Sequence, residues 1–178
     1  MERKVFNASQ QGDLDNLCGF YSVVNMMHWL YGNRIKRKPL FKTLVQYYDQ
    51  HWPVIECLTS GMNSSQMDIL LKCLKKARYS KYPITISQPF RMQRTQQTEQ
   101  ILKDCQAFLT SHEDGAILIS DQYHWSVITH IDNEYLHFYD SWDYTRIKRT
   151  RYSLRRREGA YHLYPEAIYF IERSEDIQ

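Results

Sequence analysis

The sequence of 178 residues contains no run of 18 or more apolar residues, which excludes a helix long enough to span a membrane. Its first ten residues, MERKVFNASQ, include no apolar stretch of the signal-peptide type. We therefore expect a soluble chain that has no membrane partner and does not follow the general export route. A cytoplasmic location fits this expectation, and so does delivery into a target cell by a dedicated secretion system.

Cysteine is scarce and scattered. The four cysteines lie at positions 18, 57, 73 and 105, without a CxxC pair and without a CxxC…HxxxH pattern. This spacing argues against a zinc site, and it does not form the framework of a small disulfide-rich protein. We expect free thiols in a reducing compartment, and neither a metal nor a cofactor.

The chain has only a small excess of positive charge. Its 23 Lys and Arg residues and 20 Asp and Glu residues give a net charge of +3. This value does not predict a nucleic-acid partner, and no RNA-binding signature accompanies the basic residues. The basic residues do gather in two segments, NRIKRKPLFK (33–42) and RIKRTRYSLRRRE (146–158). A solvated face is the usual role of such a run; the alternative is a binding site for an acidic or phosphorylated protein or for nucleic acid.

The first half of the chain has the 3.6-residue period of helices. The first helix ends at a Gly32-Asn33 C-cap signal, and Asn63 or Ser64 supplies the N-cap of a later one. Helices are expected at residues 17–32, 38–52, 63–79 and 98–112.

The second half changes to β-branched and aromatic runs, and the DNE segment at 132–134 reads as a hairpin turn. Helices followed by an antiparallel sheet are the pattern of an α+β fold. We expect one domain over 1–178, with a helical part at about 10–112 and a sheet part at about 113–174. Strands are expected at residues 115–121, 124–131, 135–140 and 167–172.

Cys18 stands where the polar segment QQGDLDN turns into an apolar helix. At a helix start, free backbone N–H groups and the positive end of the helix dipole stabilise a thiolate, which is the nucleophilic form. Gly19 leaves space for a substrate beside the sulfur, and the N–H of Cys18 could donate to an oxyanion. Cys73 and Cys105, by contrast, lie inside expected helices and are interpreted as small core residues.

A thiol nucleophile needs a base, and among the seven histidines His124 stands out because it opens a strand directly after the polar segment SDQY. Asp140 follows 16 residues later, across a two-strand hairpin, and a carboxylate there would fix the tautomer of the imidazole. Either Gln10 or Gln11 could supply a side-chain N–H to an oxyanion hole. The other histidines of this hairpin, at 130 and 137, are interpreted as sheet-surface groups.

The segments QGDLDNLCGFYS and HWSVI…LHFYDS resemble the nucleophile and histidine segments of papain-like cysteine peptidases, especially the compact bacterial C39-like group. The resemblance implies a papain-like fold, with a helical lobe that carries the nucleophile helix followed by an antiparallel sheet lobe. It implies Cys18 as nucleophile, His124 as base, Asp140 as orienting acid and Gln11 as oxyanion donor. The glutamine lies seven residues before the cysteine here, against six in the family, and the resemblance does not extend to residues from about 33 to 112.

The sequence thus predicts a cysteine hydrolase that acts on an amide bond of a protein or peptide, as a peptidase or as a Gln/Asn deamidase. A cytosolic processing enzyme and a bacterial effector both suit the chain. The predicted substrate-binding residues are Gly19, Trp125, Arg155, Arg156 and Arg157, the arginines selecting an acidic substrate region. The alternatives are a non-catalytic papain-fold binding module and, more weakly, a nucleic-acid-binding protein that uses the two basic segments.

Overall fold

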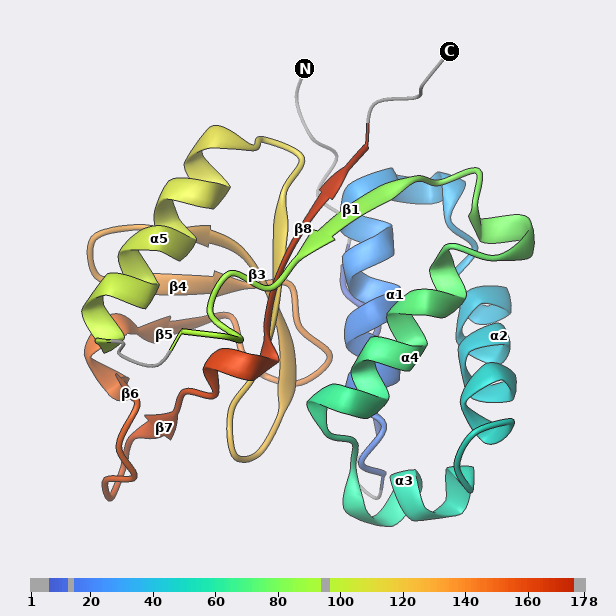
Figure 1. Ribbon diagram of the computed structural model, residues 1–178, viewed down its shortest axis with the longest axis horizontal. Helices are drawn as coiled ribbons and strands as arrows, with labels where there is room; N and C mark the ends of the chain where they lie inside the picture. The colour runs from blue at the N-terminus through green and yellow to red at the C-terminus, as the bar shows by residue number, and fades with distance from the viewer. Residues whose placement is uncertain (1–6, 13–14, 94–96, 175–178) are drawn as a thin grey trace.

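The computed structural model describes residues 7–12, 15–93 and 97–174, and these residues form a mixed α+β structure (Figure 1). Five α-helices and a six-stranded antiparallel sheet are found among them, which confirms the expected α+β class. The helices are α1 (Cys18–Tyr31), α2 (Arg37–Asp49), α3 (Val54–Ser60), α4 (Ser64–Leu74) and α5 (Thr98–Ser111). None of the described helices is both long and apolar enough to cross a bilayer.

The sheet has the strand order β1-β8-β2-β3-β4-β5, and each neighbouring pair is antiparallel. A separate parallel pair joins β6 to β7. The strands are β1 (Ile84–Ser87), β2 (Ala116–Ser120), β3 (Trp125–Ile131), β4 (Tyr135–Phe138), β5 (Arg146–Lys148), β6 (Tyr152–Ser153), β7 (Tyr161–His162) and β8 (Ile168–Arg173).

The structure differs from the sequence prediction in its shortest elements. Strand β1 lies inside the segment expected to be helical, and it pairs with β8, the last strand of the sheet. The seven-residue helix α3 and the strands β5, β6 and β7 were also not expected. These elements have two to seven residues, which is too short for a hydrophobic period to be read from the sequence.

Apolar side chains fill both faces of the sheet and form two cores. On one face α1 and α4 pack against residues such as Leu118, Val127 and Tyr169, and α2 packs on the outer side of these two helices. On the other face α5 packs against residues such as Ile117 and Ile128. Figure 1 shows the same division, with α1 to α4 on one side of the sheet and α5 on the other.

Helix boundaries follow from local capping chemistry. Asn63 is the N-cap of α4 and forms a capping box with Gln66, in which each side chain accepts a hydrogen bond from the backbone of the other residue. This selects Asn63 over Ser64. Helix α1 ends at Gly32, whose φ of 59° lies in the left-handed region that favours glycine, as the C-cap signal predicts.

The β3–β4 hairpin closes through the predicted turn, in which Asp132 Oδ1 accepts hydrogen bonds from the backbone N–H groups of Glu134 and Tyr135. Its pairing shifts by one residue between Ile128 and His130, so β3 contains a β-bulge at Thr129. The open end of the hairpin leads to residues 124 and 140, the two positions that the sequence singles out.

Candidate active site

Cys18 is the first residue of α1, and its side chain lies at the head of that helix. Leu17 occupies the N-cap position and has no polar side-chain atom to cap the helix, and residues 18–21 of the first turn include no acidic side chain. The N-terminal N–H groups and the helix dipole therefore act on this position without a competing carboxylate in that turn. The backbone N–H of Trp125 also donates to Cys18 Sγ, at 3.5 Å.

His124 and Asp140 form a buried pair, with only 1% of either side chain exposed. His124 Nε2 lies 2.9 Å from Asp140 Oδ1 and 3.1 Å from Oδ2. The same ring lies close enough to the side chain of Cys18 for the thiol to act on its pKa. Because Nε2 donates to the carboxylate, Nδ1 is the nitrogen left to face the thiol. The structure thus brings the three residues together in the order thiol, imidazole, carboxylate.

The surroundings of His124 favour its protonated form. Burial alone would lower its pKa, but the hydrogen bonds to Asp140 and Cys18, together with the charges of these groups, outweigh burial and raise the pKa to about 9. The imidazole therefore carries its second proton at neutral pH, and it can give that proton to a leaving group.

Asp121 holds the loop between β2 and β3 that presents His124. Its Oδ1 accepts hydrogen bonds from the backbone N–H groups of Tyr123 (2.8 Å) and His124 (3.1 Å), and its own N–H donates to the carbonyl of His124. Burial raises the pKa of the Asp121 carboxyl above its usual range. Sequence reasoning missed this positioning residue, although an aspartate three residues before the histidine fits an Asx turn.

Asp140 is held from two directions. Its Oδ1 accepts the backbone N–H of Trp142 at 2.8 Å, and its backbone carbonyl accepts the side-chain amide of Gln10 at 3.1 Å. The N–H of Gln11 donates to the carbonyl of Ser141 at 3.0 Å, so the N-terminal segment lies along residues 140 and 141. Buried Asn25 of α1 fixes the same segment through two hydrogen bonds to the backbone of Ser9.

These contacts separate the two candidate glutamines. The side-chain amide of Gln10 is used to hold Asp140. The side-chain oxygen of Gln11 is buried and has no hydrogen-bond partner among the described residues. The side chain of Gln11 thus makes no contact with Asp140 of the kind that Gln10 makes, and its role as oxyanion donor stays a prediction.

Aromatic rings surround the His124 imidazole. The rings of Trp142 and Tyr144 meet it edge-on, with centroids 5.6 Å and 5.3 Å away. Trp142 is half exposed and Tyr123, the residue before His124, is 70% exposed. Trp142 therefore covers one edge of the imidazole and presents part of its own ring to solvent.

Trp125 and Gly19 have positions that differ from those predicted for substrate-binding residues. Trp125 is only 2% exposed, and its indole N–H donates to the carbonyl of Met62 at 2.8 Å, so the side chain is a core element that offers substrate no surface. A Cβ on residue 19 would collide with the side chain of Met62. The space beside Gly19 is thus filled by the α3–α4 connection.

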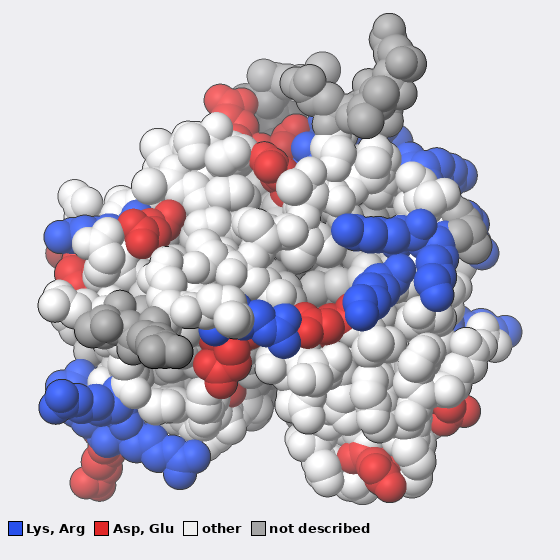
Figure 2. Space-filling model, in the orientation of Figure 1, with Lys and Arg blue, Asp and Glu red and all other residues white. Residues whose placement is uncertain are grey.

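The basic segment 146–158 does not form one uniform face. Arg156 and Arg157 line a surface pocket of about 430 Å³ with Tyr123 and His162, next to the loop that carries His124. Arg155 is exposed but is not among the residues that line this pocket. Figure 2 shows Lys and Arg gathered at the tip over β6 and β7. It also shows a notch at the lower edge, between the part of the molecule formed by α1 to α4 and the part formed by the sheet.

Arg149, in the same segment, turns inward. Its guanidinium contacts Glu99 Oε1 at 3.1 Å and donates to Gln106 Oε1 at 2.7 Å, which ties this part of the chain to α5. Arg149 is therefore a structural residue rather than a binding residue.

No protein-family model matches the chain, and neither a curated protein nor a solved structure was found to match it. The geometry of the site is therefore the basis for assigning a function.

Proposed function

We propose that this protein is a papain-like cysteine hydrolase, similar to the C39-like group, that cleaves an amide bond of a protein or peptide. One observation carries the proposal. A thiol at a helix start lies beside an imidazole, and the Nε2 atom of that imidazole is hydrogen-bonded to a buried carboxylate. Nucleophile, base and orienting acid in this order are the arrangement that covalent acyl transfer requires.

In the proposed reaction Cys18 Sγ attacks the carbonyl carbon of the substrate, and the thiol proton resides on His124 Nδ1. The oxyanion accepts hydrogen bonds from the backbone N–H of Cys18 and from the side chain of Gln11. The C–N bond breaks as the His124 proton passes to the leaving nitrogen, which leaves a thioester on Cys18. A water molecule gives a proton to His124 and attacks the thioester, which releases a carboxylic acid and restores the thiol.

Two kinds of leaving group fit this chemistry. Loss of an amine from a peptide bond makes the protein a peptidase, and loss of ammonia from a Gln or Asn side chain makes it a deamidase. Two guanidinium groups, Arg156 and Arg157, and one carboxylate, Glu158, line the pocket. The pocket suits an acidic region of either substrate, because guanidinium groups bind carboxylates and phosphates in bidentate fashion.

The direct test of the proposal is thiol reactivity. Cys18 is expected to react with iodoacetamide at pH 7 faster than the other cysteines, and the rate should fall in the His124→Ala variant. Burial raises the pKa of Cys57 to about 11 and also raises the pKa values of Cys73 and Cys105, so these three thiols are protonated at pH 7. Peptide mapping by mass spectrometry after limited labelling measures the four rates.

The matched control for this labelling is Cys18→Ser, in which the remaining three cysteines should keep their slow rates. Faster labelling at Cys57 than at Cys18, or a Cys18 rate that does not depend on His124, would favour the non-catalytic binding module.

The proposed substrate pocket yields a second prediction. Replacement of both Arg156 and Arg157 by Glu should raise KM about threefold to tenfold at low salt, with little change in Cys18 labelling, because exposed charge pairs are each worth about 0.2–1 kcal/mol. The effect should shrink at high salt, where exposed charges are screened. Kinetics on a substrate captured with the Cys18→Ala variant and identified by mass spectrometry would measure it.

Arg155→Glu is the matched control, because Arg155 is an exposed neighbour that does not line the pocket. An equal rise of KM in the control would mean that net charge matters and the pocket does not. Unchanged kinetics in the double variant would make the arginines a solvated face.

A further inference from the structure

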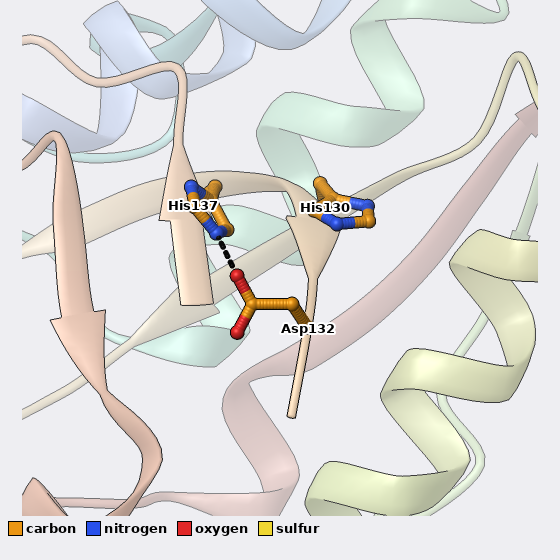
Figure 3. A group of neighbouring side chains, drawn as sticks. All are labelled: His130, Asp132 and His137. Atoms are coloured by element: carbon orange, nitrogen blue, oxygen red, sulfur yellow. Dashed lines mark hydrogen bonds and ion pairs between the residues drawn. The ribbon is translucent and has the colours of Figure 1, made fainter. Parts of the chain in front are cut away.

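Three side chains with metal-ligating atoms meet at the turn end of the β3–β4 hairpin, away from the candidate active site (Figure 3). His130 and His137 are direct partners across the two strands, and Asp132 follows His130 by two residues. Alternation along a strand and direct pairing across strands both place side chains on one face, so the three groups converge. One ligand atom from each residue lies within 4.8 Å of the other two.

The carboxylate of Asp132 is oriented before any ion arrives. Its Oδ1 accepts hydrogen bonds from the N–H groups of Glu134 and Tyr135, both at 2.7 Å. This leaves Oδ2, which lies 2.6 Å from His137 Nε2. Figure 3 marks this contact with a dashed line. The two backbone hydrogen bonds to Oδ1 are secondary contacts, so the carboxylate loses little freedom on binding a metal. The ion would replace the proton shared by Oδ2 and His137 Nε2.

We propose that His130, Asp132 and His137 form a binding site for a divalent transition-metal ion such as Zn²⁺. Two imidazole nitrogens and one carboxylate oxygen are a ligand set that Zn²⁺ accepts, with water in the fourth position. Ligand distances near 2.0–2.1 Å place the ligand atoms of a tetrahedral site about 3.3 Å apart. His130 is exposed, so a rotation of its side chain closes the longest separation.

This site acts on the fold and not on the reaction. His124 lies six residues before His130, which corresponds to about 20 Å along an extended strand. A metal at the turn would fasten the end of β3 to β4 and so fix the hairpin whose other end carries His124 and Asp140.

Neighbouring positively charged side chains lower the affinity of the proposed site for the ion. Arg146 is the direct partner of His137 on β5, and its guanidinium lies over the Tyr135 ring at 4.8 Å. The ammonium group of Lys148 lies 5.9 Å from the same ring. A third cation, Arg149, donates from its guanidinium to the backbone carbonyl of Asp132 at 3.1 Å. Removal of the positive charge beside His137, in Arg146→Gln, should therefore increase the affinity for the ion severalfold.

The test is isothermal titration of the full chain with ZnCl₂, with the Cys18→Ala variant as parent so that the thiol of Cys18 cannot ligate zinc. The parent is expected to bind one Zn²⁺, and His130→Ala should weaken binding at least tenfold. His130 is exposed, which makes this change compatible with folding. The control is His112→Ala, because His112 is paired with Glu172 outside the hairpin, and it should bind like the parent.

Hydrogen exchange locates the ion independently of affinity. Zn²⁺ should slow amide exchange in residues 131–136 of the parent and have no such effect in His130→Ala. Absence of saturable binding, equal affinity in the parent and His130→Ala, or slowed exchange elsewhere would overturn the proposal. These outcomes are distinct from failure of the proposed hydrolase, since the parent already lacks the thiol.

Discussion

His124→Ala is expected to lower kcat/KM by about 10³-fold or more on any substrate that the wild-type protein processes. The reason is that His124 both receives the thiol proton and protonates the leaving nitrogen in the proposed reaction. Because the ring is buried against Asp140 and Cys18, no neighbouring side chain takes over the transfer by a small movement. Steady-state kinetics, with far-UV circular dichroism to verify folding, measures the loss.

Asp140→Asn is the matched comparison, and its loss should be smaller because an amide oxygen can still accept a hydrogen bond from the imidazole. Its clearest effect should be on the pH profile. The wild-type activity should fall as pH rises through about 9, where His124 loses its proton, and the variant should lose activity at a lower pH because the carboxylate charge is gone.

Two results would contradict this assignment. Unchanged activity in His124→Ala would remove the histidine from the mechanism. An alkaline limb that stays at the same pH in Asp140→Asn would mean that another group titrates there.

Trp125→Ala is expected to lower the free energy of unfolding by about 4 kcal/mol, the usual cost of removing a large buried aromatic side chain. The side chain is 2% exposed, and its ring lies 6.1 Å from that of Tyr169, between centroids. Trp125→Phe keeps most of the volume but loses the hydrogen bond to the Met62 carbonyl, so its cost should be about 1–2 kcal/mol. Urea unfolding followed by circular dichroism measures both values.

Trp142→Phe is the control for these variants, because Trp142 is half exposed and should change stability little. If Trp125→Phe raised KM while its unfolding free energy stayed at the wild-type value, Trp125 would be a substrate contact after all, as the sequence first predicted.

Local chemistry explains what could be predicted from the sequence. The first helix, its glycine end, the Asn63 cap and the DNE turn each depend on residues within a few positions of one another. The approach of His124 and Asp140 follows from one hairpin, which is also a local element. The helix that begins at Cys18 and the hairpin that joins His124 to Asp140 could therefore be predicted without a structure.

Long-range pairing explains what could not be predicted. Strand β1 has four residues and exists because β8, more than 80 residues later, pairs with it. Arg149 differs from the other basic residues of its segment only in facing α5, and the sequence holds no sign of that direction. Asp132 and His137 were similarly invisible as partners of His130, because their convergence depends on strand register.

The bulge at Thr129 has a consequence for the two histidines at the ends of β3. His124 and His130 are six residues apart, an even spacing that in a regular strand directs both side chains to the same side. The extra residue reverses this. The ring of His124 contacts Tyr144 on the α5 side, whereas His130 pairs with His137 on the opposite side.

The bulge also decides where Asp140 lies. Tyr139 is set opposite Val127, with a hydrogen bond of 2.9 Å between their backbones, so Asp140 falls beside Ser126. Without the inserted residue, the pairing seen at the turn would set Asp140 opposite Val127 and direct its carboxylate behind the sheet, away from His124. The one-residue shift in pairing therefore places the two ends of the hairpin on different faces of the sheet. The proposed metal ligands at the turn lie on one face, and the His124–Asp140 pair at the open end lies on the other.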